Sequence, residues 1–207
     1  MKALYRDFTP TYSQRTSPLG MGWSFAFDSI EIVNYDLYYN QYLQRNMSLL
    51  EKRSGDRYLH LDNGQKFRIT ENLGLDGYVL DVMKLAYDNG TYTNGQGISS
   101  YYVLSYVDGI KKYFAQDGRV LAKVDKFNNR IEYQHTLIDG NPVVTRITDS
   151  LGREVSINYD FANMQVIVTA PGNKQVKYTL AQKMYYHRNP DTGEKEYKYS
   201  YYVAQRE

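Results

Sequence analysis

Short runs of alternating apolar and polar residues, separated by turns, restrict the fold of this chain more than any other feature. In the run 153–159, Val155, Ile157 and Tyr159 share one face of an extended strand, and polar residues share the other. The same period of two recurs along the chain, and Asn-Gly or Asp-Gly pairs stand between many of the runs. Because these pairs supply the positive φ angles of tight hairpins, the pattern predicts an all-β, mainly antiparallel fold.

Similar strand-turn-strand units recur in the C-terminal half of the chain, at 114–133, 144–160 and 166–178. A single unit of this kind cannot bury its apolar face, so neighbouring units must stack into a continuous sheet. We therefore expect stacked hairpins in an open, coiling sheet and divide the chain into an N-terminal β region, 1–112, and a repeat region, 113–207.

One segment departs from the strand pattern. Within 40–52, Leu43, Met47 and Leu50 are spaced as one face of a helix, which predicts a short helix there. The preceding segment, 35–39, is rich in tyrosine and is equally consistent with the end of a strand.

The repeated units resemble the YD-repeat, or rearrangement-hotspot (RHS) repeat, family. Units of that family carry an Asp-x-x-Gly-Arg turn followed by an apolar strand that ends in Tyr-Asp. The best match here begins at Asp149, continues through Gly152 and Arg153, and ends at Tyr159 and Asp160. The more degenerate turns contribute Asp117, Gly118, Arg119, Asp125 and Arg130. Upstream, 17–25 resembles a Gly-x-Gly-Trp segment that precedes the first repeats in bacterial members, and it contains Trp23.

The resemblance implies a β-sheet ribbon that coils into a hollow shell. Such shells belong to large secreted or surface proteins of bacteria that encapsulate a C-terminal toxin, and to animal cell-adhesion relatives. On this basis we expect a non-catalytic structural segment, extracellular or wall-associated, whose partners are the rest of a larger repeat protein and a toxin or adhesion module. Residues 1–18 contain no secretory signal. Either the targeting signal lies upstream of this chain, or the protein is cytoplasmic.

Exposed sheet edges invite pairing with another chain, so a segment of a repeat array is also expected to self-associate through its terminal strands.

The Asp and Arg residues of the turns have three possible roles. Arginine presents five donors in a planar fork and could reach carbonyl groups or the aspartate of an adjacent turn, which would link successive turns into a ladder. The alternatives are simple solvent exposure and ligand binding. We favour the ladder, formed by Arg119, Arg130 and Arg153 with Asp117, Asp125, Asp149 and Asp160.

The 23 tyrosines leave a second function open. Tyr197, Tyr199 and Tyr201 fall on one face of a strand and could form a platform for sugars, which would make the chain a carbohydrate-binding module. Packing within the sheet explains the same stripe without a ligand, and we favour it. Trp23 has the same two possible roles. Its ring could pack at the first turn of the sheet, which we favour, or it could contact a ligand.

Composition and motifs give no support to several other classes of function. The chain has no cysteine, three scattered histidines, and none of the common hydrolase, phosphate-loop or zinc-protease motifs, so we predict no enzyme, no metal and no cofactor. A formal net charge of +2 argues against nucleic-acid binding, and no apolar run is long enough for a membrane span. The loop 88–95 carries oxygen ligands but lacks the calcium-loop pattern, which favours a hairpin turn.

Overall fold

The structure is a computed structural model that describes residues 3–5, 19, 23–33, 55–138, 141–188 and 195–206. Across these ranges the chain forms strands and turns, without a helix, and every strand pair is antiparallel. The prediction of an all-β antiparallel fold is confirmed. The helix predicted at 40–52 and the strand end considered at 35–39 both lie outside the described residues.

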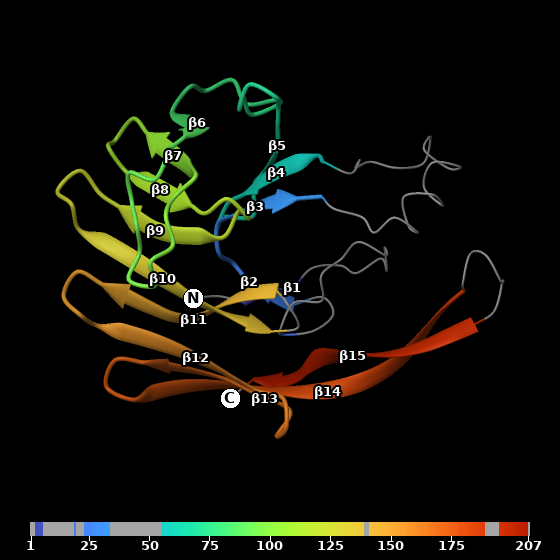
Figure 1. Cartoon of the computed structure of the whole chain (residues 1–207). Helices are drawn as coiled ribbons and strands as arrows, with labels where there is room; N and C mark the ends of the chain where they lie inside the picture. Colours follow the sequence, from blue (N-terminus) through green and yellow to red (C-terminus); the bar gives the residue numbers. More distant parts are fainter. Residues whose placement is uncertain are drawn as a thin grey trace.

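One ten-stranded sheet dominates the molecule, and its strands lie side by side in the order of the sequence (Figure 1). The strands are β6 (Met83–Tyr87), β7 (Tyr102–Tyr106), β8 (Lys111–Phe114), β9 (Val120–Val124), β10 (Arg130–Ile138), β11 (Asn141–Asp149), β12 (Glu154–Asp160), β13 (Gln165–Ala170), β14 (Lys174–Arg188) and β15 (Lys195–Arg206). β6 and β15 form its two opposite edges, so the sheet is open.

The predicted division between 112 and 113 falls inside β8. Because β8 pairs with β7 on one side and with β9 on the other, the sheet continues across this position without a break.

Tight turns join the strands at most of the places that the Gly-containing pairs indicate. Gly109, Gly118 and Gly172 adopt positive φ angles of 88°, 84° and 77° between successive strands. The turn between β12 and β13 has no glycine and was not indicated by these pairs. There Met164 takes a φ of 54°, and Asn163 donates from its backbone and side-chain nitrogens to the Asp160 carboxylate at 3.1 and 2.8 Å.

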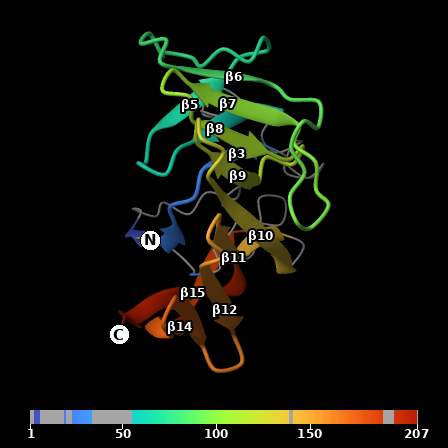
Figure 2. The same ribbon diagram turned by 90° about the vertical axis from the view of Figure 1, so that its left-hand side faces the viewer.

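Two smaller sheets come from the N-terminal part of the chain. β1 (Ala3–Tyr5) pairs with β2 (Trp23–Phe25), while β3 (Ser29–Ile32), β4 (Arg57–His60) and β5 (Lys66–Ile69) form a three-stranded sheet. Figure 2 shows the three-stranded sheet at the same end of the molecule as β6–β9.

The three-stranded sheet packs on the first strands of the large sheet. Ile30 and Leu59 from the small sheet share one buried cluster with Leu104, Phe114 and Val120 from the large one. The two sheets are also joined through the backbone, because Ile30 N donates to Gly118 O at 2.8 Å in the β8–β9 turn. This docking fixes the position of β3 relative to that turn.

A second buried cluster lies under the later strands. It combines Leu19 with Val144, Ile157, Val166, Tyr178 and Leu180, and Phe25 and Phe27 pack against it. The Phe25 ring meets the Tyr178 ring edge to face at 6.0 Å. Residues from the N-terminal region therefore cover the same large sheet at both ends of the strand series.

The hairpin of β14 and β15 reaches beyond the rest of the sheet. β13 pairs with β14 only as far as Thr179, and from Leu180 to Arg188 β14 pairs, among the described residues, with β15 alone. This part forms the long red ribbon that extends away from the other strands in Figure 1.

Candidate functional site

The predicted turn residues lie at the ends of the hairpins, but their ion pairs stay within single turns. Arg119 pairs with Asp117 across the β8–β9 turn, and Arg153 Nε donates to Asp149 Oδ2 at 2.7 Å in the β11–β12 turn. The Asp149 carboxylate also accepts from two backbone N–H groups of its own turn. Hydrogen bonding to Arg153 lowers the pKa of Asp149 below its usual value. These pairs close individual turns.

The other two aspartates use asparagine as their side-chain partner. Asp125 Oδ2 accepts from Asn129 Nδ2 at 2.9 Å, as Asp160 does from Asn163. One contact does cross between turns, but it involves the backbone of Arg130: Arg130 N donates to Ser150 Oγ at 2.6 Å. The predicted Asp–Arg ladder between turns is therefore wrong for the described contacts, because an Asx-type turn offers each carboxylate nearer donors.

Of the three tyrosines in the glycan platform predicted on β15, only Tyr201 has a side chain within the described part of the structure. The Tyr201 side chain is half-buried, packs against the second hydrophobic cluster, and stacks on Phe161 with ring centroids 5.6 Å apart. This arrangement agrees with packing. The backbones of Tyr197 and Tyr199 lie in β15 and that of Trp23 in β2, while the side chains of these three residues lie outside the described part. Tyr159, from the repeat motif, donates its hydroxyl to Val144 O at 2.9 Å.

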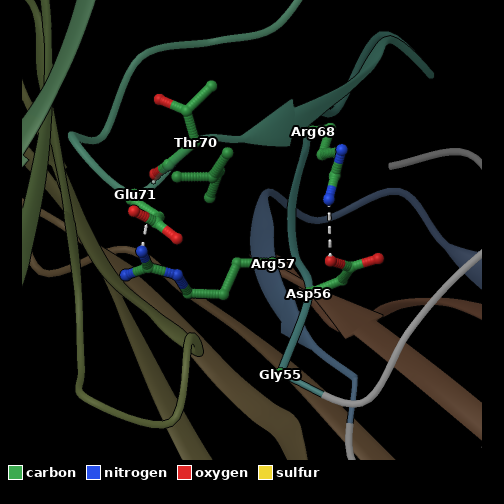
Figure 3. Close-up of a pocket in the computed structure, with 7 residues that line it drawn as sticks. Gly55, Asp56, Arg57, Arg68, Thr70 and Glu71 are labelled. Carbon is green, nitrogen blue, oxygen red and sulfur yellow. Dashed lines mark hydrogen bonds and ion pairs between the residues drawn. The ribbon is translucent and has the colours of Figure 1, made fainter.

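Sequence reasoning missed a recess between the ends of β4 and β5, shown in Figure 3. The recess has a volume of about 340 Å³ and is lined by Gly55, Asp56, Arg57, Arg68, Ile69, Thr70 and Glu71. Arg68 Nη2 pairs with Asp56 Oδ1 at 3.0 Å. Arg57 instead donates to two neutral oxygens, Tyr102 Oη and Thr70 O, each at 3.5 Å. Both arginines line the recess, but from opposite faces of the small sheet, because Arg57 pairs with Ile69 and Arg68 with Tyr58 across β4 and β5.

Three tyrosines cluster near this recess: Tyr87 at the end of β6, Tyr102 at the start of β7, and Tyr101 just before β7. The side chain of Tyr102 is buried, and its ring centroid lies 5.6 Å from that of Tyr87 and 4.8 Å from that of Tyr101. Tyr87 and Tyr101 are 49% and 37% exposed. Because Tyr102 also contacts Arg57, the aromatic cluster lies next to one residue of the recess. Tyr87 and Tyr102 are cross-strand partners, a pairing that depends on register and has no signature in the sequence.

A buried ion pair lies between the two sheets. Lys112 Nζ on β8 bonds Asp28 Oδ1 at 2.8 Å, and both side chains are almost fully buried. Asp28 Oδ1 also accepts the backbone N–H of Asp62 at 3.0 Å. Burial acts to lower the pKa of Lys112, but the hydrogen bond to Asp28 and the charge of that carboxylate together outweigh it and leave the pKa above its usual value. These groups neutralise each other, so we assign them to docking of the sheets.

The loop 88–95, which carries oxygen ligands, folds back on itself and onto β10. Its tip, Asn94–Ile98, closes a small hairpin through a bridge between Thr93 and Ser99, so the hairpin interpretation is confirmed. Glu132 holds the loop by accepting from Tyr92 Oη at 2.7 Å and from Gly95 N at 2.9 Å. In the part of the chain that the structure describes, histidine and acidic side chains form no group of three that could hold a metal ion.

The same loop covers His135. The side chain of Gln96 donates to His135 O at 2.9 Å and accepts from His135 N at 2.8 Å. The imidazole is buried and its Nδ1 has no hydrogen-bond partner. Burial, with a further contribution from Arg119, lowers the pKa of His135 to about 4. The imidazole is therefore neutral at pH 7.

We predict that His135 makes the protein less stable in mild acid. Unfolding returns its pKa to about 6.5, so the unfolded chain binds more protons between that value and the folded pKa. The stabilising effect is complete above pH 6.5 and is lost as the pH falls toward 4. Between pH 7 and pH 5 the free energy of unfolding should fall by about 2 kcal/mol. Urea unfolding at both pH values tests this, and an equal fall in His135→Gln would contradict it.

Scans of the sequence against models of known protein families and against curated proteins find no match. Among the described residues, no helix has the length and apolar character needed to cross a membrane.

Proposed function

We propose that this chain is a non-catalytic structural segment of a larger secreted or surface protein of the YD-repeat type. In this proposal its sheet forms part of a coiling β-shell that encloses or presents a C-terminal toxin or an adhesion module. The supporting observation is the strand order: ten consecutive strands, each added beside the previous one, with an open edge at β6 and another at β15. A sheet built in this way can be extended at either end by further hairpins.

The turns support the same proposal. Asp117 and Asp149 each bond groups within their own turn, so each hairpin is closed locally and can follow the next as a self-contained unit. The edge at β6 is also preceded by exposed apolar side chains, with Val79 at 88% and Leu80 at 70% exposure. A neighbouring unit that paired with β6 would cover such residues.

The proposal predicts association of the isolated chain through its edges. Static light scattering at increasing concentration should show dimers or larger assemblies, and the double substitution Val79→Lys with Leu80→Lys should weaken association at least about tenfold. Phe127 and Leu151 are equally exposed but lie in turns away from the β6 edge, so Phe127→Lys with Leu151→Lys is the matched control and should change little.

A strict monomer at high concentration would count against the proposal, as would equal effects of the two double variants. The parent reading frame offers an independent test, since we expect it to encode further strand-turn-strand units.

The alternative, a carbohydrate-binding module that uses Tyr197, Tyr199, Tyr201 and Trp23, has no supporting observation at Tyr201, which packs on Phe161.

A further inference from the structure

We propose that Lys112 and Asp28 are a modification site, at which their side chains join in an isopeptide bond with Asp62 as the proton carrier. The bond is an amide between Lys112 Nζ and Asp28 Cγ, and it would link β8 to the segment that leads into β3, across 84 residues of sequence. Because the chain has no cysteine, no disulfide can make such a link. This inference goes beyond the structural role proposed above and does not depend on it.

The first observation is that the two reacting groups are held in contact by the docked sheets. Lys112 Nζ lies 2.8 Å from Asp28 Oδ1, and the two side chains are 5% and 4% exposed. Lys112 is the cross-strand partner of fully buried Leu104, so its side chain lies on the face of β8 that packs on the small sheet. Asp28 directly precedes β3, which is fixed by the hydrogen bond from Ile30 N to Gly118 O. An amine and an acid held together in this way react as if at very high concentration.

The second observation is that the surroundings of the pair favour a neutral product. Two buried charges lose their hydration, and their mutual attraction repays this cost only in part. An amide carries no charge and keeps a carbonyl oxygen for the backbone N–H of Asp62, which already donates to Asp28 Oδ1 at 3.0 Å. The centroid of the Tyr106 ring lies 5.4 Å from Lys112 Nζ and adds an aromatic wall. Because water is a product of the condensation, its exclusion from this site favours the bond.

The third observation is a second carboxylate, placed to move the protons: Asp62 Oδ2 lies 3.9 Å from Lys112 Nζ. The reaction starts when the Lys112 ammonium passes a proton to the Asp28 carboxylate, and burial favours the acid form by raising the pKa of Asp28. The amine nitrogen then bonds to Asp28 Cγ, while the Asp62 carboxylate accepts a proton from that nitrogen.

Asp62 returns the proton to the departing hydroxyl of Asp28, the C–O bond breaks, and one water molecule leaves. No atom is oxidised or reduced, and the Asp62 carboxylate is regenerated. The hydrogen bond to Asp28 keeps the proton on Lys112 most of the time, so the reaction is slow and a freshly made chain contains the ion pair alone.

Intact mass spectrometry of the purified chain, incubated at neutral pH for a week, tests the proposal. Most of the chain should become lighter by one water molecule, and digestion should release a branched peptide that joins the segments of Asp28 and Lys112. Lys112→Arg keeps the positive charge but has no amino group to form this bond, so it should retain its calculated mass. Lys66→Arg is the matched control, because Lys66 lies 3.8 Å from Glu31 in a more exposed pair, and it should lose water as the parent chain does.

Two further substitutions test the chemistry of the bond. Asp28→Asn puts an amide in place of the acid, so the same condensation should release ammonia instead of water. Asp62→Asn keeps the backbone donor but removes the carboxylate, and it should slow the loss of water at least about tenfold. Glu154→Gln removes an acid from an exposed pair with Arg146 and should leave the rate unchanged. Melting temperatures verify that each variant is folded, and that of the parent chain should rise as the bond forms, because a cross-link restricts the unfolded chain.

An unchanged mass of the parent chain after the week would overturn the proposal. A loss of water that persists in Lys112→Arg would overturn it too, because an aspartate before glycine, such as Asp108, can lose water by closing onto the next backbone nitrogen. Loss of water instead of ammonia from Asp28→Asn would likewise place the reaction elsewhere. An equal rate in Asp62→Asn and the parent chain would contradict the role given to the second carboxylate.

Discussion

Gly118→Ala is expected to destabilise the protein by about 4 kcal/mol or more, among the largest effects of a single methyl group. Gly118 has a φ of 84°, and a Cβ at this position would stand 1.8 Å from Ile30 O. Alanine would therefore adopt a left-handed conformation, at a cost of about 1–2 kcal/mol, and would also push β3 away from the β8–β9 turn. That movement breaks the hydrogen bond from Ile30 N to Gly118 O and opens the first hydrophobic cluster.

Gly152→Ala separates the two causes. Gly152 has a similar φ of 75° in the β11–β12 turn, but nothing lies within 4 Å of the added Cβ. Only the backbone strain remains, so this variant should lose about 1–2 kcal/mol. Urea unfolding of both variants measures the difference. Equal losses would show that Ile30 is not held against the turn in the way described.

Asp28→Leu is expected to cost about 3–5 kcal/mol, because it leaves the Lys112 ammonium buried without a counter-charge. Lys112 lies 2.8 Å from Asp28, and its next carboxylate, Asp62, is 3.9 Å away and half exposed to solvent. Asp62 can compensate only weakly for the lost partner.

The double variant Asp28→Leu with Lys112→Met provides the control. Replacing both charges with apolar groups removes the cost of a lone buried charge, so the double variant should be more stable than the Asp28→Leu single variant and within about 2 kcal/mol of the parent chain. Chemical unfolding of the parent chain, the single variants Asp28→Leu and Lys112→Met, and the double variant gives the coupling energy. Additive losses in the double variant would contradict the role assigned to the pair.

Local features of the sequence predicted the hairpins because a turn depends on a few consecutive residues. Each such turn holds, within four or five residues, an aspartate whose carboxylate accepts backbone N–H groups and a glycine that adopts a positive φ angle. Examples are Asp117 with Gly118 and Asp149 with Gly152. The alternation in 153–159 likewise identified β12 and its buried Ile157. The turn at Asp160–Met164 has no glycine, so the sequence pattern did not predict it. In this turn Met164 adopts the positive φ angle, and Asn163 donates to the Asp160 carboxylate.

The partners of Arg153, Arg130 and Asp125 were harder to predict. The sequence shows that acids and bases recur at a fixed interval, but it does not show whether a nearer group within the same turn satisfies each one. Asn129 is such a group for Asp125, while Ser150, from the next turn, bonds the backbone of Arg130 and not its guanidinium.

Only the tertiary structure decided which surfaces meet. Asp28 and Lys112 form a hydrogen bond although they are 84 residues apart in the sequence. From the sequence alone, Lys112 would be placed on the solvent-facing side of β8. Arg57 joins Tyr102 only because the three-stranded sheet docks beside β6 and β7. The period of an apolar pattern determines which face of a strand is buried, but the element that covers this face is chosen by contacts between distant segments, which leave no local signal in the sequence.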